Sequence, residues 1–283
     1  MTNLDPTLDL VAFGLNIVDD YAPDYIGWTV PPLHGCCNDA AAWSMLGALL
    51  RLNSTNVLST YAGPTSALGG QVPPFRTVLD CTRQVLRNWI GQRAEYVTRE
   101  LAAGRDPLTV LTISGHGAQE VYPLETIESL VLSDGLLPDF EFHNLLAKFP
   151  ARARVLVILD TCHSGGMDRA AQFRYSPRFA GVRPSLDEEG RQIREVVAKE
   201  VIRANIAVLS ACPKDTTALD GQFNGAFTGS CMSIAQDMLS NRSRPDTHNF
   251  FAASQALCER QFRQQPVATF YGDRSVWNKP FMS

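Results

Sequence analysis

A cysteine and a histidine, each placed just after an apolar run, are the residues of this chain best suited to chemistry. A free thiol has a pKa of about 8.5 and is mostly protonated at neutral pH. A nearby imidazole removes the proton or stabilises the thiolate, which makes the sulfur a nucleophile. The sequence therefore predicts Cys162 as a nucleophile and His116 as its base. The two motifs are Ser114-Gly115-His116-Gly117 and Asp160-Thr161-Cys162-His163-Ser164-Gly165-Gly166.

Backbone donors beside these residues are candidates for an oxyanion hole. Attack by a thiolate on a carbonyl group gives a thioacyl intermediate. On the way, negative charge develops on the carbonyl oxygen, and this oxyanion is stabilised by N–H groups that are already in place. The N–H groups of Gly117 and Cys162 are the candidates. His163 adjoins the nucleophile and is a rival base, but successive side chains of an extended segment point to opposite faces. His163 is therefore poorly placed for the sulfur.

Each motif also has a structural interpretation. A cysteine that follows a buried strand is usually an inert core residue, and a Ser-Gly-His-Gly segment is often only a turn. Here the two motifs follow two successive apolar runs, and His116 and Cys162 are 46 residues apart. Their occurrence together favours the catalytic interpretation.

The elements that must position these motifs are predicted to be alternating strands and helices. Apolar runs without polar alternation suit strands buried on both faces. Strands are expected at residues 8–18, 107–114, 154–160 and 206–210, with a second strand at either 56–61 or 75–79 and a hairpin around 119–133. Helices are expected at 39–51, 82–103, 138–148, 188–203, 227–240 and 249–264, the first with Asn38 as its N-cap. This alternation predicts an α/β fold with a mostly parallel sheet, whose ligand site lies beyond the carboxyl ends of the strands.

Composition excludes several classes of protein. The 283 residues include 25 basic and 29 acidic side chains, with no basic stripe that would predict nucleic-acid binding. No apolar stretch approaches the length of a membrane span, and from the composition of the first residues we do not expect a signal peptide. The seven cysteines are an odd number without a Cys-x-x-Cys pair, which favours a reducing compartment over a disulfide or zinc framework. We expect a cytoplasmic monomer that binds neither nucleic acid nor membrane.

At these motifs the chain resembles the caspase-like cysteine peptidases, and within them the metacaspases and their bacterial relatives, the orthocaspases. The matching segments follow the family order over roughly residues 8–235. The Gln-Ala-Cys-x-Gly signature of animal caspases is absent, although the distance from histidine to cysteine is close to the caspase spacing of about 50 residues. Besides the two motifs above, the matching segments are Gly35-Cys36-Cys37-Asn38-Asp39-Ala40, Asp134-Gly135-x-x-x-Asp139 and Ser210-Ala211-Cys212.

The resemblance implies a caspase-hemoglobinase fold, with a six-stranded sheet and helices on both faces. It implies a single peptidase domain over residues 1–283, divided into a large catalytic part at about 1–165, a charged linker at 166–204 and a small part at 205–283. It also implies an endopeptidase that cleaves after arginine or lysine, with a pocket formed by Cys36, Asp39, Ser114 and Asp160. Two carboxylates in one pocket would favour a guanidinium group, although Asp39 also suits the start of a helix for electrostatic reasons.

Calcium is a possible cofactor that the same resemblance implies, because many metacaspases bind it through acids near the active site. The acids near those positions here are Asp134, Asp139 and Asp168, with Glu141 available. Calcium takes six to eight oxygen ligands, and Phe140 follows Asp139 where the family has paired acids. The alternative is that these acids are only solvated.

The charged linker at 166–204 is a candidate site of self-cleavage. It carries seven arginines and Lys199, and exposed polar loops are preferred sites of nicking. Because the end of the linker looks helical, a cut is expected nearer Arg169, Arg174, Arg178 or Arg183. Two other functions stay open: a catalytically silent scaffold with this fold, and a clostripain-like or legumain-like peptidase of other specificity.

Overall fold

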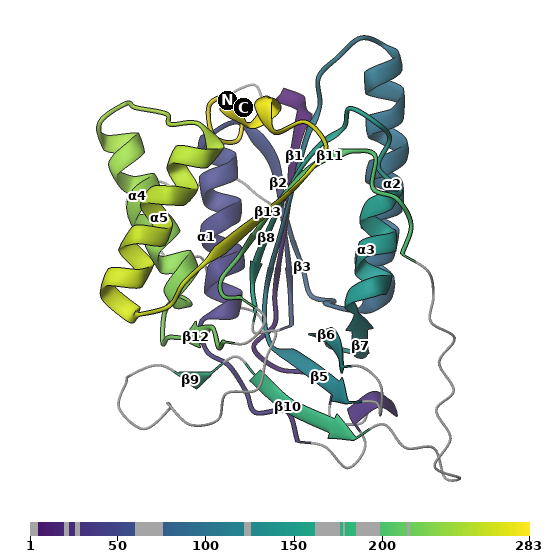
Figure 1. The fold of residues 1–283 in the computed structure, drawn as a ribbon, viewed down its shortest axis with the longest axis vertical. Helices are drawn as coiled ribbons and strands as arrows, with labels where there is room; N and C mark the ends of the chain where they lie inside the picture. Colours follow the sequence, from purple (N-terminus) through teal and green to yellow (C-terminus); the bar gives the residue numbers. More distant parts are fainter. Residues whose placement is uncertain are drawn as a thin grey trace.

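The centre of the computed structural model is a seven-stranded sheet (Figure 1). The structure describes residues 5–19, 23–25, 29–59, 76–121, 126–161, 176–177, 179–184, 199–213 and 216–283. Neighbouring strands of the sheet are parallel, except that the edge strand β13 runs antiparallel to β11. In sheet order the strands are β13 (Val267–Tyr271), β11 (Asn205–Ser210), β8 (Arg154–Asp160), β4 (Leu108–Ser114), β1 (Asp5–Gly14), β2 (Leu52–Leu58) and β3 (Arg76–Val78).

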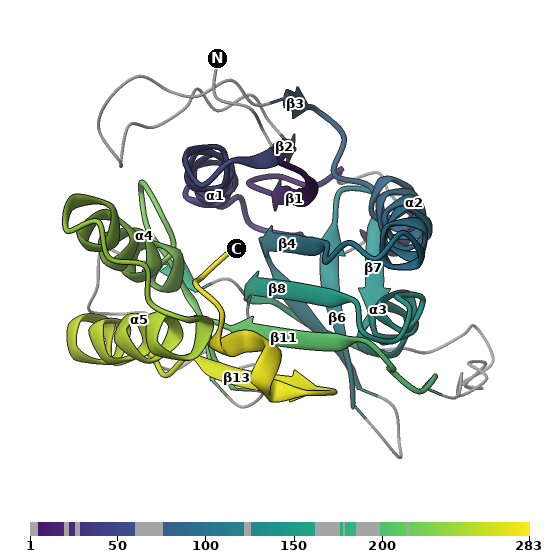
Figure 2. The ribbon, with the colours of Figure 1, turned by 90° about the horizontal axis from the view of Figure 1, so that it is seen from above.

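Helices cover both faces of this sheet (Figure 2). One face carries α1 (Cys36–Leu49), α4 (Ala226–Ser240) and α5 (Thr247–Phe262), and the other carries α2 (Arg83–Ala102) and α3 (Asp139–Ala147). The central strands are buried on both sides, so their successive side chains enter two different cores. In β8, for example, Leu156 and Ile158 join the core under α1, α4 and α5, whereas Val155 and Val157 join the core under α2 and α3. This two-sided burial explains why the strands read as continuous apolar runs.

Smaller sheets lie beyond the carboxyl ends of the central strands (Figure 1). A four-stranded sheet has the order β10 (Phe179–Pro184), β5 (Gly117–Val121), β6 (Thr126–Leu132) and β7 (Gly135–Pro138), and a two-stranded sheet pairs β12 (Leu219–Asp220) with β9 (Ser176–Pro177). Short 3-10 helices occur at Pro23–Tyr25 and Arg274–Asn278. Two strands of the smaller sheets, β9 and β10, therefore belong to the charged linker that follows Cys162.

The predicted fold class and the mostly parallel sheet are confirmed, but three details were wrong. The sheet has seven strands rather than six, because both candidate segments for the second strand form strands and β13 adds an edge. Helix α1 begins at Cys36, with Gly35 rather than Asn38 as N-cap, since the Asp39 N–H already donates to the Gly35 carbonyl oxygen at 2.9 Å. The helix predicted at 188–203 is absent over residues 199–203, and its remainder lies outside the described residues.

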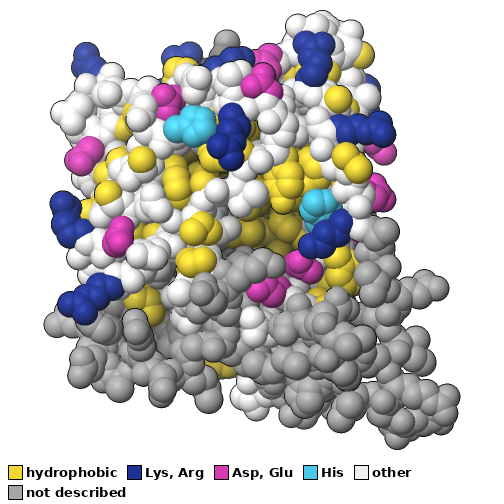
Figure 3. Space-filling model, viewed as in Figure 1, with side chains coloured by type: hydrophobic (Ala, Val, Ile, Leu, Met, Phe, Trp, Pro, Cys, Tyr) yellow, Lys and Arg dark blue, Asp and Glu magenta, His cyan; other side chains and the backbone are white. Residues whose placement is uncertain are grey.

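The described surface carries charges of both signs. On the face drawn in Figure 3, basic and acidic side chains are interspersed around a central hollow where hydrophobic side chains gather. Among the helices of the described residues, none is both long enough and apolar enough to span a bilayer.

Candidate active site

The two predicted catalytic motifs leave the sheet from neighbouring strands. Strands β4 and β8 are paired in parallel, with Ser114 directly opposite Asp160 in the last step of the register. His116 follows Ser114 by two residues, and Cys162 follows Asp160 by the same number. The structure describes this exit as far as Thr161, so Cys162, His163 and Asp168 lie outside the described residues. The sheet thus brings together the segments that carry the predicted dyad.

The imidazole of His116 is held in one orientation by the loop before α1. The ring is buried, and its Nε2 lies 2.7 Å from the carbonyl oxygen of Pro31. A carbonyl oxygen only accepts hydrogen bonds, so Nε2 carries the proton. In the neutral ring the basic nitrogen is then Nδ1. This arrangement sets the tautomer that a general base needs, and Pro31 was not among the predicted site residues.

The peptide group between His116 and Gly117 is oriented by strand β6. The carbonyl oxygen of His116 accepts a hydrogen bond from the Val131 N–H at 3.1 Å. In a trans peptide group the N–H points opposite to the C=O. The Gly117 N–H therefore points away from β6, toward the edge of β5 along which β10 runs. The β5–β6 ladder thus does not use the predicted oxyanion donor, which points to the side of β5 where Phe179 of β10 is the register partner of Gly117.

The two acids of the predicted pocket converge on the start of α4. Asp39 Oδ1 accepts from the Gly225 N–H at 3.0 Å and from Asn224 Nδ2 at 2.9 Å. Asp160 Oδ2 accepts from the Thr228 N–H at 2.9 Å and from its hydroxyl at 2.7 Å. The side chains of both acids are completely or almost completely buried. Carboxylates at a helix N-terminus are favoured by the helix dipole and by its unpaired N–H groups, so both acids have a structural role beside any role in binding.

The other two predicted pocket residues lie with these acids. Ser114 is buried and is the register partner of Asp160, whereas Cys36 is buried in the first turn of α1, three residues before Asp39. The structure therefore brings Cys36, Asp39, Ser114 and Asp160 into one region at the carboxyl ends of the strands. A third buried acid, Asp220, lies in the same region, with Oδ1 4.0 Å from Cys36 Sγ. Sequence reasoning missed Asp220 because its strand β12 has only two residues and no motif.

Three of the acids considered for calcium, Asp134, Asp139 and Glu141, lie in the described residues, and each is paired with a basic side chain. Asp134 accepts from the Arg83 N–H at 2.8 Å and also faces its guanidinium, and Lys199 Nζ lies 2.9 Å from Asp139 Oδ2. Glu141 is bound by Arg87. Within the described ranges no three or more His, Cys, Asp or Glu side chains gather into a potential metal site. The described residues therefore do not fit a calcium ion, and Asp168 lies outside them.

The described cysteines are all buried free thiols. Burial raises the pKa of Cys231 well above its usual value, and the charges of Asp160 and Asp39 raise it further. Burial also raises the pKa of Cys81, and that of Cys258 to about 12. These thiols stay protonated and inaccessible at neutral pH, which makes them poor nucleophiles.

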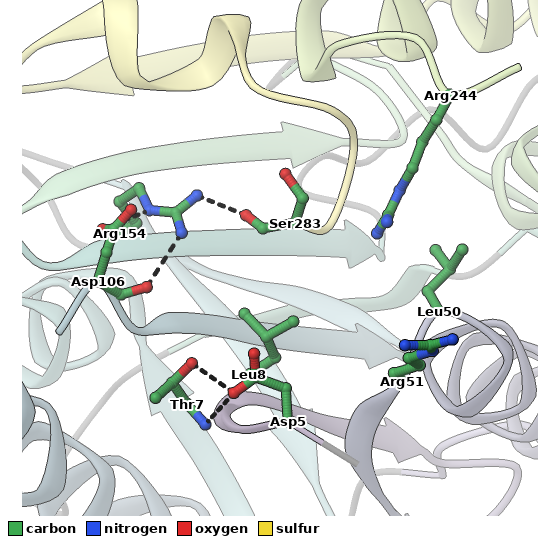
Figure 4. Close-up of a pocket in the computed structure, with 9 residues that line it drawn as sticks. All are labelled: Asp5, Thr7, Leu8, Leu50, Arg51, Asp106, Arg154, Arg244 and Ser283. Atoms are coloured by element: carbon green, nitrogen blue, oxygen red, sulfur yellow. Dashed lines mark hydrogen bonds and ion pairs between the residues drawn. The ribbon is translucent and has the colours of Figure 1, made fainter. Parts of the chain in front are cut away.

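A cavity at the opposite end of the sheet is separate from these residues (Figure 4). It measures about 660 Å³ and lies where the strands begin. Its buried Arg154 is already bound to Asp106 Oδ1 at 3.0 Å and to the Ser283 carbonyl oxygen at 2.7 Å. Arg154 therefore has a structural role, in tying the last residues of the chain to β8.

Comparisons with known proteins identify the family of the chain and match its fold. The sequence profile of the caspase domain family, Peptidase C14, matches residues 18–271. The crystal structure of protein GSU0716 from Geobacter sulfurreducens has a TM-score of 0.69 at 25% identity, covering 96% of this chain and 97% of that chain. Caspase-1 from Spodoptera frugiperda has a TM-score of 0.54 at 10% identity, covering 93% and 85%, which is a likeness of fold alone. No curated protein sequence gives a match.

Proposed function

Because the chain belongs to the caspase domain family of cysteine peptidases, we propose that it is an endopeptidase that cleaves proteins after arginine or lysine. Cys162 is the nucleophile and His116 is its base. The observation that carries this proposal is the 2.7 Å contact between His116 Nε2 and the Pro31 carbonyl oxygen, which leaves Nδ1 as the basic nitrogen. The pairing of Ser114 with Asp160 supports it, because both catalytic residues follow this pair by two positions.

The reaction proceeds in two halves. The Cys162 thiol transfers its proton to His116 Nδ1, and the sulfur attacks the carbonyl carbon of the arginine or lysine residue. The N–H groups of Gly117 and Cys162 stabilise the oxyanion. When the C–N bond breaks, the leaving amine takes the proton from His116 and the thioacyl-enzyme remains. Water then attacks the thioester, with His116 as base, and releases the carboxylic acid and the thiol.

Selectivity for a basic residue follows from Asp39 and Asp160. A buried carboxylate attracts a guanidinium or ammonium group and repels an acidic side chain. The N–H donors from the start of α4 hold both carboxylates in place before substrate arrives. The proposed pocket therefore does not have to reorganise its charges around each substrate.

Labelling with a thiol-reactive peptide that ends in arginine tests the proposed function. We expect one label per chain, at Cys162, because the other six cysteines are buried. We expect the same labelling rate, within about twofold, in millimolar calcium and in a chelator, since the described acids already hold basic side chains. Intact mass and peptide mapping give the site and the stoichiometry, with Cys162→Ala as the control.

The outcomes separate the alternatives. No labelling of folded protein would support a silent scaffold, and labelling by other peptides but not by the arginine peptide would support a different specificity. If calcium strongly raised the labelling rate, the expectation of equal rates with and without calcium would be wrong. Such a result would indicate a calcium site that includes Asp168.

Self-cleavage in the charged linker is a further part of the proposal. The end of the linker is attached to α3, through the Lys199–Asp139 pair and a 2.8 Å bond from the Glu200 N–H to Asn144 Oδ1. Arg183 lies within β10 and precedes a proline, and neither a paired strand nor an imide bond suits an extended binding groove. Among the predicted positions, this favours cleavage after Arg169, Arg174 or Arg178 over cleavage after Arg183.

We expect two fragments from the wild-type chain and a single full-length mass from Cys162→Ala, measured by intact mass spectrometry after incubation. Arg169→Gln combined with Arg174→Gln and Arg178→Gln should block the cut, whereas Arg183→Gln should not. A single full-length mass in a wild-type sample that cleaves a reporter peptide would show that the uncut chain is the active form.

A further inference from the structure

Asp220 lies in the small part of the chain but contacts the loop that enters α1. The residue is buried, with only 2% of its surface exposed. One oxygen, Oδ2, accepts from the His34 N–H at 2.8 Å, and the other, Oδ1, accepts from the Gly35 N–H at 3.1 Å. A single carboxylate thus holds two consecutive backbone N–H groups just before the helix begins. This is the part of a helix where the dipole favours an anion.

The loop that Asp220 holds has two functions in the proposed site. Its beginning carries Pro31, whose carbonyl oxygen orients His116. Its end leads into the first turn of α1, with Cys36 and Asp39. A displacement of this loop would therefore disturb the base and the basic pocket together.

The fit between Asp220 and the loop is close. A Cβ atom at Gly35 would lie 2.7 Å from Asp220 Oδ1 and 2.9 Å from the Gly221 carbonyl oxygen. Contacts shorter than van der Waals distance force one side to move, so the approach requires a glycine. On its other side the loop is fixed by Asn16, whose carbonyl oxygen accepts from the Leu33 N–H at 2.7 Å and whose Oδ1 accepts from the Cys37 N–H at 3.0 Å.

We propose that Asp220 is a positioning residue of the peptidase site. It fixes the loop from Pro31 to Cys36 so that the Pro31 carbonyl oxygen keeps His116 in the Nε2–H tautomer and so that Cys36 and Asp39 stay in the pocket. The expected loss of activity in an Asp220 variant rests on the proposed function. The expected change in the tautomer of the His116 ring does not depend on catalysis.

Asparagine is the sharpest replacement because it has the size of aspartate but only one acceptor oxygen. In Asp220→Asn the amide NH₂ group would face one of the two backbone N–H groups, and the bidentate contact would be lost. Asp9→Asn is the matched control. Asp9 is a buried acid on β1 that is bound by Asn53 at 2.8 Å and lies near Arg93, at the end of the sheet remote from the site.

The experiment combines kinetics with a spectroscopic measurement. For Asp220→Asn we expect kcat/KM on an arginine reporter to fall about 10- to 100-fold, as for a displaced catalytic group. The Pro31 carbonyl oxygen, which stabilises the imidazolium form of His116, is no longer held in place in this variant. The acid limb of the pH profile of kcat/KM should therefore move to lower pH. Nitrogen-15 NMR of the five histidines, with His116→Gln for assignment, should show the Nε2–H tautomer of His116 in the wild type and a mixture in the variant. Asp9→Asn should lower the melting temperature and leave the profile and the tautomer unchanged.

An unchanged pH profile and an unchanged His116 tautomer in folded Asp220→Asn would overturn the inference. If Asp220→Asn does not fold, Gly35→Ala perturbs the same contact with the charge retained, and a wild-type His116 spectrum there would overturn it equally. A wild type with the Nε2–H tautomer but no cleavage or labelling would instead contradict the proposed function alone.

Discussion

Replacing Cys162 or His116 with alanine is expected to lower kcat/KM for an arginine reporter peptide by at least about a thousandfold. Cys162→Ala removes the nucleophile, and His116→Ala removes the base whose Nδ1 is made basic by the contact between Nε2 and Pro31. The double variant should be little worse than either single variant, because residues that act as one unit have non-additive effects. Steady-state kinetics on all three variants measure this, with circular dichroism to show that each is folded.

His163→Ala is the matched control for the base. Since His163 adjoins Cys162 in the chain, its replacement perturbs the neighbourhood of the nucleophile without removing the proposed base. We expect its activity to stay within about threefold of wild type, which corresponds to less than 1 kcal/mol of transition-state stabilisation. Near-normal turnover in His116→Ala together with loss in His163→Ala would reverse the assignment.

Replacing Asp160 with asparagine is expected to lower kcat/KM for an arginine substrate about 30- to 1,000-fold. Removing one charge of a buried pair costs about 2–4 kcal/mol, and each 1.4 kcal/mol is about tenfold. The asparagine oxygen can still accept from the Thr228 N–H, so the start of α4 keeps its cap. The wild type should cut reporters that end in arginine or lysine and should leave one that ends in aspartate uncut.

Thr228→Val separates the two roles of Asp160. It removes the hydroxyl that donates to Asp160 Oδ2 at 2.7 Å, but leaves the backbone N–H and the carboxylate charge. We expect about 1 kcal/mol of lost stability, read from thermal unfolding, with the preference for arginine retained. Loss of that preference in Thr228→Val, or efficient cleavage after aspartate by the wild type, would argue against a pocket based on the charge of Asp160.

The central sheet was predictable because a strand that is buried on both faces has a run of apolar residues in its sequence. The runs that became β4, β8 and β11 are mainly apolar and do not alternate apolar with polar residues, and their boundaries agree with the prediction to within one residue. Strand β13 was not predicted, because it is an edge strand that is only half-buried and its sequence does not have to be continuously apolar. Its pairing with β11 depends on a contact that is remote in sequence.

The candidate site was predictable only in part, for a related reason. The adjacency of the two motif-bearing strands could be predicted, because motifs at neighbouring strand ends meet in space, whereas the pocket residues were predicted from the family resemblance. Pro31 contributes its backbone carbonyl oxygen, and the Asp220 carboxylate bonds backbone N–H groups; a backbone carbonyl or N–H has no residue type that a motif could record. The same holds for the start of α1: local sequence indicated Asn38 as the cap, whereas an acid from a distant strand bonds the N–H groups of His34 and Gly35.

The reciprocal contacts between the two helix starts make the parts on either side of the charged linker interdependent for folding. Asp220 from the later part bonds the backbone ahead of α1, while Asp39 and Asp160 from the earlier part bond the backbone at α4. In addition, β11 is inserted between β8 and β13 in the continuous sheet. The two parts therefore share one sheet and hold each other's helix starts, and the described strands of the linker add the β10–β5 and β9–β12 pairings to these contacts. A break in the linker would leave a nicked protein whose pieces remain associated and unfold together in a single transition, as two fragments that complement each other.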